Sequence, residues 1–240
     1  MDTRRWIEAK RASLLDEDHL RDRLRSVTRL RERWRADNAE LEIVCRRSCY
    51  QREDMASIKR RETFIDFLKN DEIIATAEFM EWDKVDRHFA YEIDLIDECD
   101  AVSSGALEMA VFVTSNWDEF EHPLDYGTIV VFNRLVITRE TDAVWHAISD
   151  AIDIEFGKAS IMVLKPFPLE WEGDLTEENE ERFIHRQAAM MRCYRRRLGV
   201  ETIDGDPGEW MWKPIRGPEP VPGMSAEWHE RDRGLRLMFP

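Results

Sequence analysis

The chain has 240 residues, a formal net charge of -15 and 43% hydrophobic residues. This length has room for one large domain, or for one domain with a helical extension, and the hydrophobic fraction is sufficient for a buried core. The acidic balance argues against a general nucleic-acid binder, because an acidic surface repels phosphate. No apolar run reaches the ~18 residues that a membrane-spanning helix needs, so we expect no association with a membrane.

Residues 1–59 are expected to form a charged helical extension. Arginines crowd positions 4–35, and residues 16–36 carry apolar side chains at helical spacing, which predicts an amphipathic helix there. The apolar positions of this helix are Leu20, Leu24, Val27, Leu30 and Trp34. Its arginine-rich face could contact nucleic acid, but such faces are more often simply solvated, and the interleaved acids favour solvation.

The cysteine pattern predicts a reducing compartment. Cys45, Cys49, Cys99 and Cys193 form no disulfide framework, and the N-terminus lacks the apolar segment of a secretory signal. A cytoplasmic location is therefore expected. Cys45 and Cys49 are four positions apart but have no second pair or histidine partner, so no metal site is predicted.

The middle of the chain changes to strand patterns. Residues 63–68 and 73–80 predict a hairpin around Asn70 and Asp71, and residues 106–114 suggest another strand. The region from Asp71 to Asp125 is densely acidic, which could attract a cationic substrate such as an amine. A solvated surface explains the same acids.

The second half of the chain alternates strands and helices. The expected elements are strand 126–137, helix 142–156, strand 160–164, helix 176–198, and two closing strands at 200–203 and 209–213. This order predicts an α/β domain over residues 60–213, with a mixed, largely antiparallel central sheet flanked by helices. Residues 214–240 are rich in Pro and Gly and are expected to form an irregular tail.

Three segments resemble the GNAT superfamily of N-acyltransferases. The segment Tyr194–Val200 looks like the family signature, in which an aromatic, a few charged residues and Leu-Gly end the fourth helix. Leu135–Thr138 is similar to the end of the family's fourth strand, and Val163–Leu169 lies where the fifth strand ends. The resemblance covers residues 60–213 and implies a GNAT-like fold.

The resemblance implies acetyl-CoA as co-substrate. In the family, the fourth and fifth strands splay apart, the pantetheine arm lies between them, and the pyrophosphate lies at the N-terminus of the next helix. The cofactor-binding residues implied here are Leu135, Val136, Ile137, Arg139, Thr141, Asp142 and Ala143. Asp142 and Val144 stand where the family loop has small residues. The carboxylates of Glu140 and Asp142 would face the pyrophosphate with like charge, although an aspartate there is also an ordinary N-cap.

The catalytic candidates follow from the same resemblance. Tyr194 would return a proton to the departing thiolate, although it stands one position earlier than the family tyrosine. Alternatively, Tyr194 is a core aromatic on the stripe of Phe183, Met190 and Leu198. Candidates for the base that deprotonates the substrate ammonium are Glu78, Glu81 and Glu108, on or near the central strands.

Two functions remain open at this point. One is an acyl-CoA-dependent N-acyltransferase that transfers acetyl to an amine of a small molecule or protein. The other is a non-catalytic GNAT-like scaffold or interaction module that has lost cofactor binding. A toxin-like acetyltransferase acting on charged tRNA fits less well, because such relatives are usually basic on the tRNA-facing side.

Overall fold

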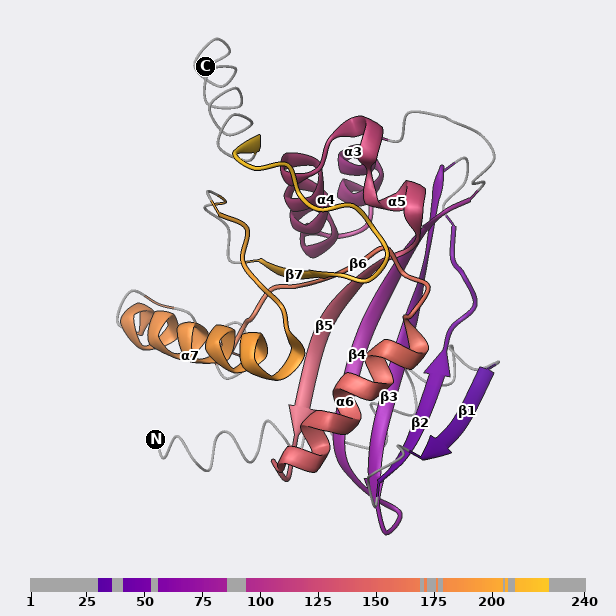
Figure 1. Cartoon of the computed structure of the whole chain (residues 1–240), viewed down its shortest axis with the longest axis vertical. Coiled ribbons are helices and arrows are strands. Elements are labelled where there is room, and N and C mark those ends of the chain that lie inside the picture. The colour runs from indigo at the N-terminus through magenta and orange to yellow at the C-terminus, as the bar shows by residue number, and fades with distance from the viewer. Residues whose placement is uncertain are drawn as a thin grey trace.

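One seven-stranded sheet organises the molecule, with the strands ordered β1 to β7 as in the sequence (Figure 1). The computed structural model describes residues 30–35, 41–52, 56–85, 94–168, 171, 176, 179–204, 206 and 210–224. The strands are β1 Leu30–Arg35, β2 Glu42–Arg47, β3 Ile58–Lys69, β4 Glu72–Lys84, β5 Ile129–Ile137, β6 Ile161–Leu164 and β7 Met211–Pro214. Neighbouring strands pair antiparallel, except that β5 and β6 run parallel. The predicted α/β class with a mixed, largely antiparallel sheet is confirmed.

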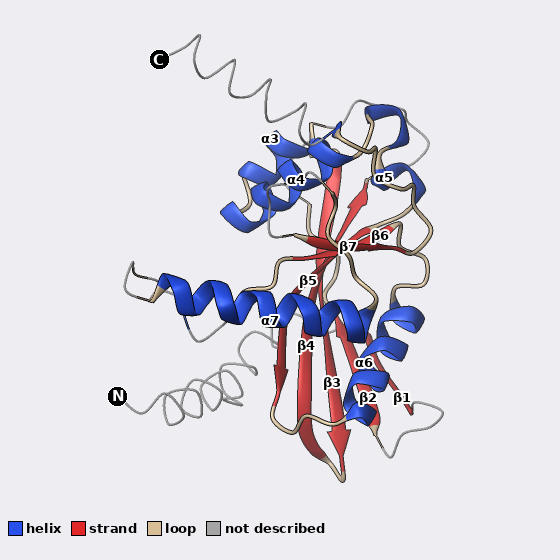
Figure 2. Cartoon of the chain, turned by 60° about the vertical axis from the view of Figure 1, so that its left-hand side comes forward, coloured by secondary structure: helices blue, strands red, loops and turns tan. Residues whose placement is uncertain are grey.

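Helices cover both faces of this sheet. They are α3 Leu95–Asp100, α4 Ser104–Asn116, the 3₁₀ turn η1 Glu119–Glu121, α5 Pro123–Tyr126, α6 Asp142–Glu155 and α7 Glu180–Leu198. Residues of α6 and α7 share one hydrophobic core with β2–β5, whereas α3 and α4 build a second core on the other face. In Figure 2, α7 crosses the strands and its C-terminal end lies beside α6.

The hairpin of β3 and β4 matches its prediction. Asn70 and Asp71 both have positive φ, 54° and 64°, as the two central residues of a type I′ turn require. Asparagine and aspartate tolerate this left-handed conformation better than other residues with a Cβ, which explains why this pair makes the turn. Gly199 ends α7 at φ 67°, in agreement with the prediction that it ends the helix.

Two predicted elements are wrong. Residues 106–114 form most of α4, not a strand, and Ser103 caps that helix by accepting a hydrogen bond from the Ala106 N–H. Residues 106–113 are apolar except for Glu108, and such a run lacks the periodicity that distinguishes a helix from a buried strand. Residues 30–35, expected to end the helix 16–36, form β1 and pair with β2. Pairing in a sheet has overridden the helix propensity of Leu, Arg and Glu there. Residues 16–29 lie outside the described residues.

The sheet also begins earlier than expected, since β1, β2 and the first residues of β3 precede residue 60. At the other end, the strand expected at 200–203 is reduced to a single bridge between Glu201 and Trp212. The described part of the tail, 215–224, has no strand and packs onto the domain. The indole Nε1 of Trp117 donates to the Pro218 carbonyl at 2.9 Å. A Cβ on Gly217 would lie 2.1 Å from Ser160 Oγ, so this close approach requires glycine.

Candidate functional site

The parallel strands β5 and β6 separate after a short paired segment. Ile129–Val131 of β5 pairs with Ile161–Val163 of β6, but β5 continues to Ile137 whereas β6 ends at Leu164. Pro166 and Pro168 follow β6, and proline cannot donate to a strand ladder. Figure 1 shows β6 and β7 leaving the direction of β5 at a wide angle. The gap expected between the strands that end at Ile137 and Leu164 is therefore present.

A β-bulge lies where the two strands separate. In β4, Phe79 pairs with Phe132, and the residue before it, Glu78, pairs with Arg134. Asn133 is therefore an extra residue of β5. Bulges bend a strand, leave the extra residue unpaired, and are over-represented next to active sites. The bulge thus marks the C-terminal half of β5 as a separate segment.

The C-terminal half of β5 turns backbone groups toward the gap. The Thr138 N–H donates to the Ile74 carbonyl at 2.9 Å, so these two residues are a hydrogen-bonded pair of the β4–β5 ladder. Hydrogen-bonded and non-hydrogen-bonded positions alternate along an antiparallel ladder. The N–H and C=O groups of Leu135 and Ile137 consequently point away from β4, to the side where β6 would continue if it were longer.

Two cavities meet at the bulge, one on each face of the sheet. The smaller has a volume of about 30 Å³ and is lined by Leu135, Met190 and Tyr194 among others. The larger has a volume of about 230 Å³ and is lined by residues of α4, including Glu108 and Met109. Both are also lined by Phe132, Asn133 and Lys165. A ligand in the gap between β5 and β6 would therefore connect the α7 side to the α4 side.

Tyr194 occupies the α7 side of the gap. Its ring centroid lies 6.4 Å from that of Phe132 and 6.2 Å from that of Trp145, so it packs in the core beneath α6. It also lines the smaller cavity, so the catalytic and core-aromatic interpretations are compatible in geometry. Burial raises the pKa of its hydroxyl far above the ordinary value, with a smaller contribution from Cys193. The hydroxyl is thus a neutral hydrogen-bond donor at physiological pH.

The three predicted carboxylates lie in different surroundings. Glu108 is on α4 rather than on a strand, and its Oε2 accepts a 2.8 Å hydrogen bond from Lys165 Nζ beside the larger cavity. Glu78 is half-buried on β4 and lines neither cavity at the bulge. Glu81 is buried, with both carboxylate oxygens bonded to Arg61 and one also to Thr63. Only Glu108 is positioned to contact a ligand at the bulge.

The loop before α6 differs from the expected anion site. Thr141, not Asp142, is the N-cap, because its Oγ1 accepts from the Val144 N–H at 3.3 Å. Asp142 Oδ1 lies 2.6 Å from Nη2 of Arg197, and Glu140 Oε1 accepts a 3.0 Å bond from the indole of Trp145. Both acids therefore have partners within the chain: Asp142 pairs with the positive charge of Arg197, whereas Glu140 keeps its charge and accepts a hydrogen bond from a neutral indole.

The other implied cofactor residues lie on two sides of this loop. Leu135 lines the smaller cavity, Ile137 packs against the core beneath α6, and Val136 is buried. Arg139 and Ala143 are exposed. The residues that sequence reasoning missed are Lys165 and Arg197, although Lys165 had one signal, its position directly after a buried strand and before proline.

In the part of the chain that the structure describes, no cluster of three or more His, Cys, Asp or Glu side chains could hold a metal ion. No described helix is both long enough and apolar enough to span a bilayer. A scan against protein-family models found no match, and searches of curated proteins and of solved structures found no similar protein.

Proposed function

We propose that this chain is an acyl-CoA-dependent N-acyltransferase with a GNAT-like fold, and that it binds the acyl-CoA in the gap between β5 and β6. The supporting observation is the separation of these two parallel strands at the Asn133 bulge, with a cavity on each face of the sheet at that point. Cavities on both faces of the sheet at one point would let a thioester bind from one face and an acceptor approach it from the other.

The pantetheine arm would bind as an additional strand. Its two amide groups can bond to the outward-facing backbone groups of Leu135 and Ile137, as an extended peptide does at a sheet edge. This interaction needs no particular side chain, which suits an apolar segment such as Leu135–Ile137. The thioester would then lie near Asn133, between the two cavities.

The larger cavity would hold the amine acceptor. Its walls are mainly apolar, and Glu108 is a carboxylate that can take a proton from a substrate ammonium. The amine nitrogen then attacks the thioester carbon, the C–S bond breaks, and the second nitrogen proton passes to the departing thiolate. The neutral hydroxyl of Tyr194 would stabilise that thiolate by donating a hydrogen bond. Lys165 holds Glu108 in place at 2.8 Å.

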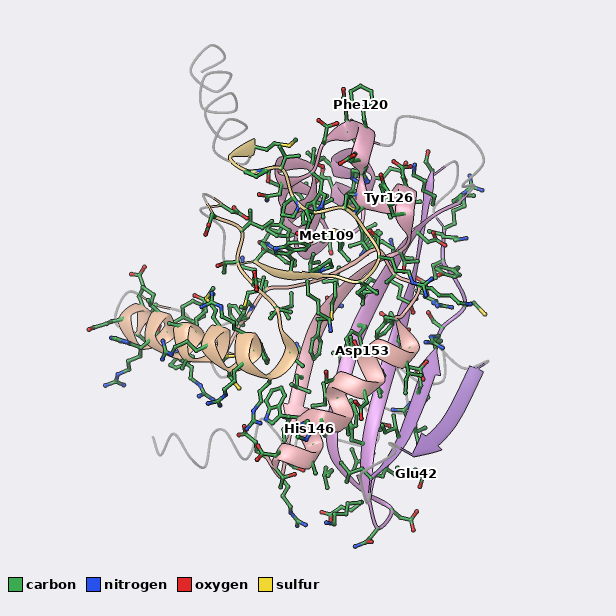
Figure 3. All side chains as sticks on the ribbon, in the orientation of Figure 1. Glu42, Met109, Phe120, Tyr126, His146 and Asp153 are labelled. Atoms are coloured by element: carbon green, nitrogen blue, oxygen red, sulfur yellow. The ribbon has the colours of Figure 1, made fainter. Side chains whose placement is uncertain are left out.

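Titration with acetyl-CoA tests this proposal. Binding should raise the melting temperature, with about 2.7 kcal/mol of added stability at a hundredfold excess over Kd. Tyr194→Phe should bind acetyl-CoA normally but acetylate a panel of amines about 10²-fold more slowly. Tyr126→Phe is the matched control, because Tyr126 is an exposed tyrosine of α5 on a different part of the molecule from α7 (Figure 3). If millimolar acetyl-CoA gives neither a calorimetric heat of binding nor a rise in melting temperature, the proposal is contradicted.

A second candidate is a non-catalytic interaction module on the same scaffold. It is favoured by the loop before α6, where Asp142 and Glu140 are bonded within the chain and no glycine lets backbone approach a phosphate. The cavity on the α7 side has a volume of only about 30 Å³, and this small volume also favours a module that does not bind a cofactor. The acetyl-CoA titration separates the candidates, since this one predicts no binding.

A further inference from the structure

Helix α7 is basic in an acidic protein. It contains six arginines and only two acids, whereas the whole chain carries a net charge of -15. Arg186 and Arg197 are eleven positions apart, which is about three turns and about 16 Å along one face. Met190, which lines the smaller cavity, stands between them at the same helical spacing. This face, defined by Arg186 and Arg197, is called the arginine face below.

The arginine face meets the acids of the loop before α6. Arg197 is bonded to Asp142 at 2.6 Å, and the charge of Glu140 helps to raise the pKa of the Cys193 thiol, after the larger effect of burial. Asp142 remains mostly exposed, with 74% of its side chain accessible. Within the described residues, Nε of Arg197 is buried and has no acceptor. Because 26% of the Arg197 side chain is accessible, its guanidinium can also bond an acceptor from outside the chain.

We propose that the arginine face binds the phosphate groups at the nucleotide end of the co-substrate, and that Asp142 acts as an internal counter-ion which the ligand must displace. The proposal rests on the function proposed above. It moves the phosphate contacts from the backbone of the loop before α6 to side chains of α7. Guanidinium groups form bidentate bonds to phosphate and do not need the close backbone approach that glycines provide.

The spacing of the arginines favours a ligand with two separated phosphate groups. Two phosphate groups bond Arg186 and Arg197 at the same time more readily than one does, because about 16 Å of helix separates the two backbone positions. Arg134, which lines the smaller cavity, adds a third positive charge next to the gap. An adenosine 3′,5′-bisphosphate moiety, as found at the end of coenzyme A, carries two phosphate groups on one ribose, and the long side chains of Arg186 and Arg197 can lean toward each other to bond one group each. Its tail would then enter the gap beside Leu135.

Calorimetric titration with adenosine 3′,5′-bisphosphate and with acetyl-CoA tests the proposal. Asp142→Asn should bind both ligands about two- to fivefold more tightly, the range expected for loss of an exposed ion pair. Arg197→Gln and Arg186→Gln should each bind at least about tenfold more weakly, because a charge-assisted bond is lost. Arg192→Gln is the matched control, since Arg192 is exposed and lies well over 90° away around the helix; its affinity should stay within about twofold.

A double variant checks the competition directly. If Asp142 acts through Arg197, Asp142→Asn should give no further gain in a chain that already carries Arg197→Gln. Equal affinities of wild type, Asp142→Asn and Arg197→Gln would overturn the proposal, as would failure of the bisphosphate to bind both wild type and Asp142→Asn. If the bisphosphate binds with the expected pattern but no acetyl transfer occurs, phosphate binding by the arginine face would be supported and the proposed acyltransferase activity would be contradicted. If acetyl transfer occurs and is unchanged by Asp142→Asn and by Arg197→Gln, the acyltransferase activity would be supported and phosphate binding by the arginine face would be contradicted.

Discussion

Two arginine–carboxylate clusters in this molecule have the same chemistry and opposite surroundings. Glu81 is 3% exposed and accepts two bonds from Arg61, at 2.9 and 2.7 Å, and one from Thr63 at 2.7 Å. Arg47 lies 3.7 Å from the same carboxylate and is bonded to Glu155 at 2.5 Å. By contrast, Asp142 at the start of α6 is mostly exposed and forms an ion pair with Arg197.

The difference separates a structural cluster from a replaceable one. Removing one member of a buried cluster leaves an uncompensated charge, which costs far more than the pair contributes. An exposed pair is worth about 0–1 kcal/mol, so a ligand with stronger acceptors can displace it. Glu81 is therefore fixed in a structural role, whereas Arg197 is available for exchange between Asp142 and a phosphate.

The largest effect is expected at the buried cluster. Glu81→Gln should lower the free energy of unfolding by about 3–5 kcal/mol, because Arg61 keeps its charge but loses the carboxylate that it bonds, and Arg47 keeps only Glu155. Urea denaturation measures this loss. Glu119→Gln, at an exposed glutamate of η1, is the control and should change stability by less than about 0.5 kcal/mol. If Glu81→Gln lowers the free energy of unfolding by as little as Glu119→Gln does, the Glu81 cluster would not have the structural role that distinguishes it from the Asp142–Arg197 pair.

A pH titration of His122 sharpens the contrast between buried and exposed sites. Burial lowers the pKa of His122 to about 4; Asp125 opposes this shift and Lys84 reinforces it. Its Nδ1 also accepts from the Leu124 N–H at 3.2 Å, which requires that nitrogen to be unprotonated. Because the unfolded chain binds the proton near pH 6.5 and the folded chain only near pH 4, stability should fall as the pH drops through this window, by up to about 3 kcal/mol.

His122→Asn removes that contribution while keeping an N-cap acceptor for α5. The difference in unfolding free energy between wild type and variant should therefore change between about pH 6.5 and pH 4 and be constant above about pH 7. Urea denaturation at a series of pH values gives this difference. A difference that is flat across the window would mean that His122 titrates normally and is not desolvated.

The smallest effect is expected at the exposed pair. Asp142→Asn should lower the free energy of unfolding by less than about 1 kcal/mol, and the change should shrink in high salt. Thr141 supplies the N-cap bond of α6, so the helix start is retained in the variant. Thermal unfolding at low and high salt measures both quantities. A salt-independent loss of several kcal/mol would place Asp142 with Glu81 in the structural class.

Local patterns predicted most of the sheet. Asn70–Asp71, the apolar run of β5 and the glycine after α7 each carry their own signal, so the hairpin, the central strand and the last helix could be found from sequence. Helix α4 could not be found in this way, because its central residues 106–113 are apolar except for Glu108, so they show no helical periodicity. Strand β1 could not be predicted from sequence either, because its local pattern is helical and its pairing with β2 outweighs that pattern.

The candidate site was only partly predictable for a related reason. The separation of β5 and β6 was expected from a resemblance, and Tyr194 and Glu108 were named, but not their partners. Lys165 meets Glu108 across 57 positions of sequence, and Arg197 meets Asp142 across the whole of α6, β6 and α7. No local periodicity reports such contacts, since they depend on how α4 and α7 pack against the sheet.

Amide hydrogen exchange at β5 is the most direct test of the central claim. If the pantetheine arm binds as an additional strand, saturating acetyl-CoA should slow exchange of the Leu135 and Ile137 amides by about tenfold or more. The Val136 amide faces β4 and should exchange as slowly without the ligand as with it, which makes it an internal control. Unchanged exchange at Leu135 and Ile137 under conditions where acetyl-CoA binds would contradict the account, because the ligand would then lie outside the β5–β6 gap.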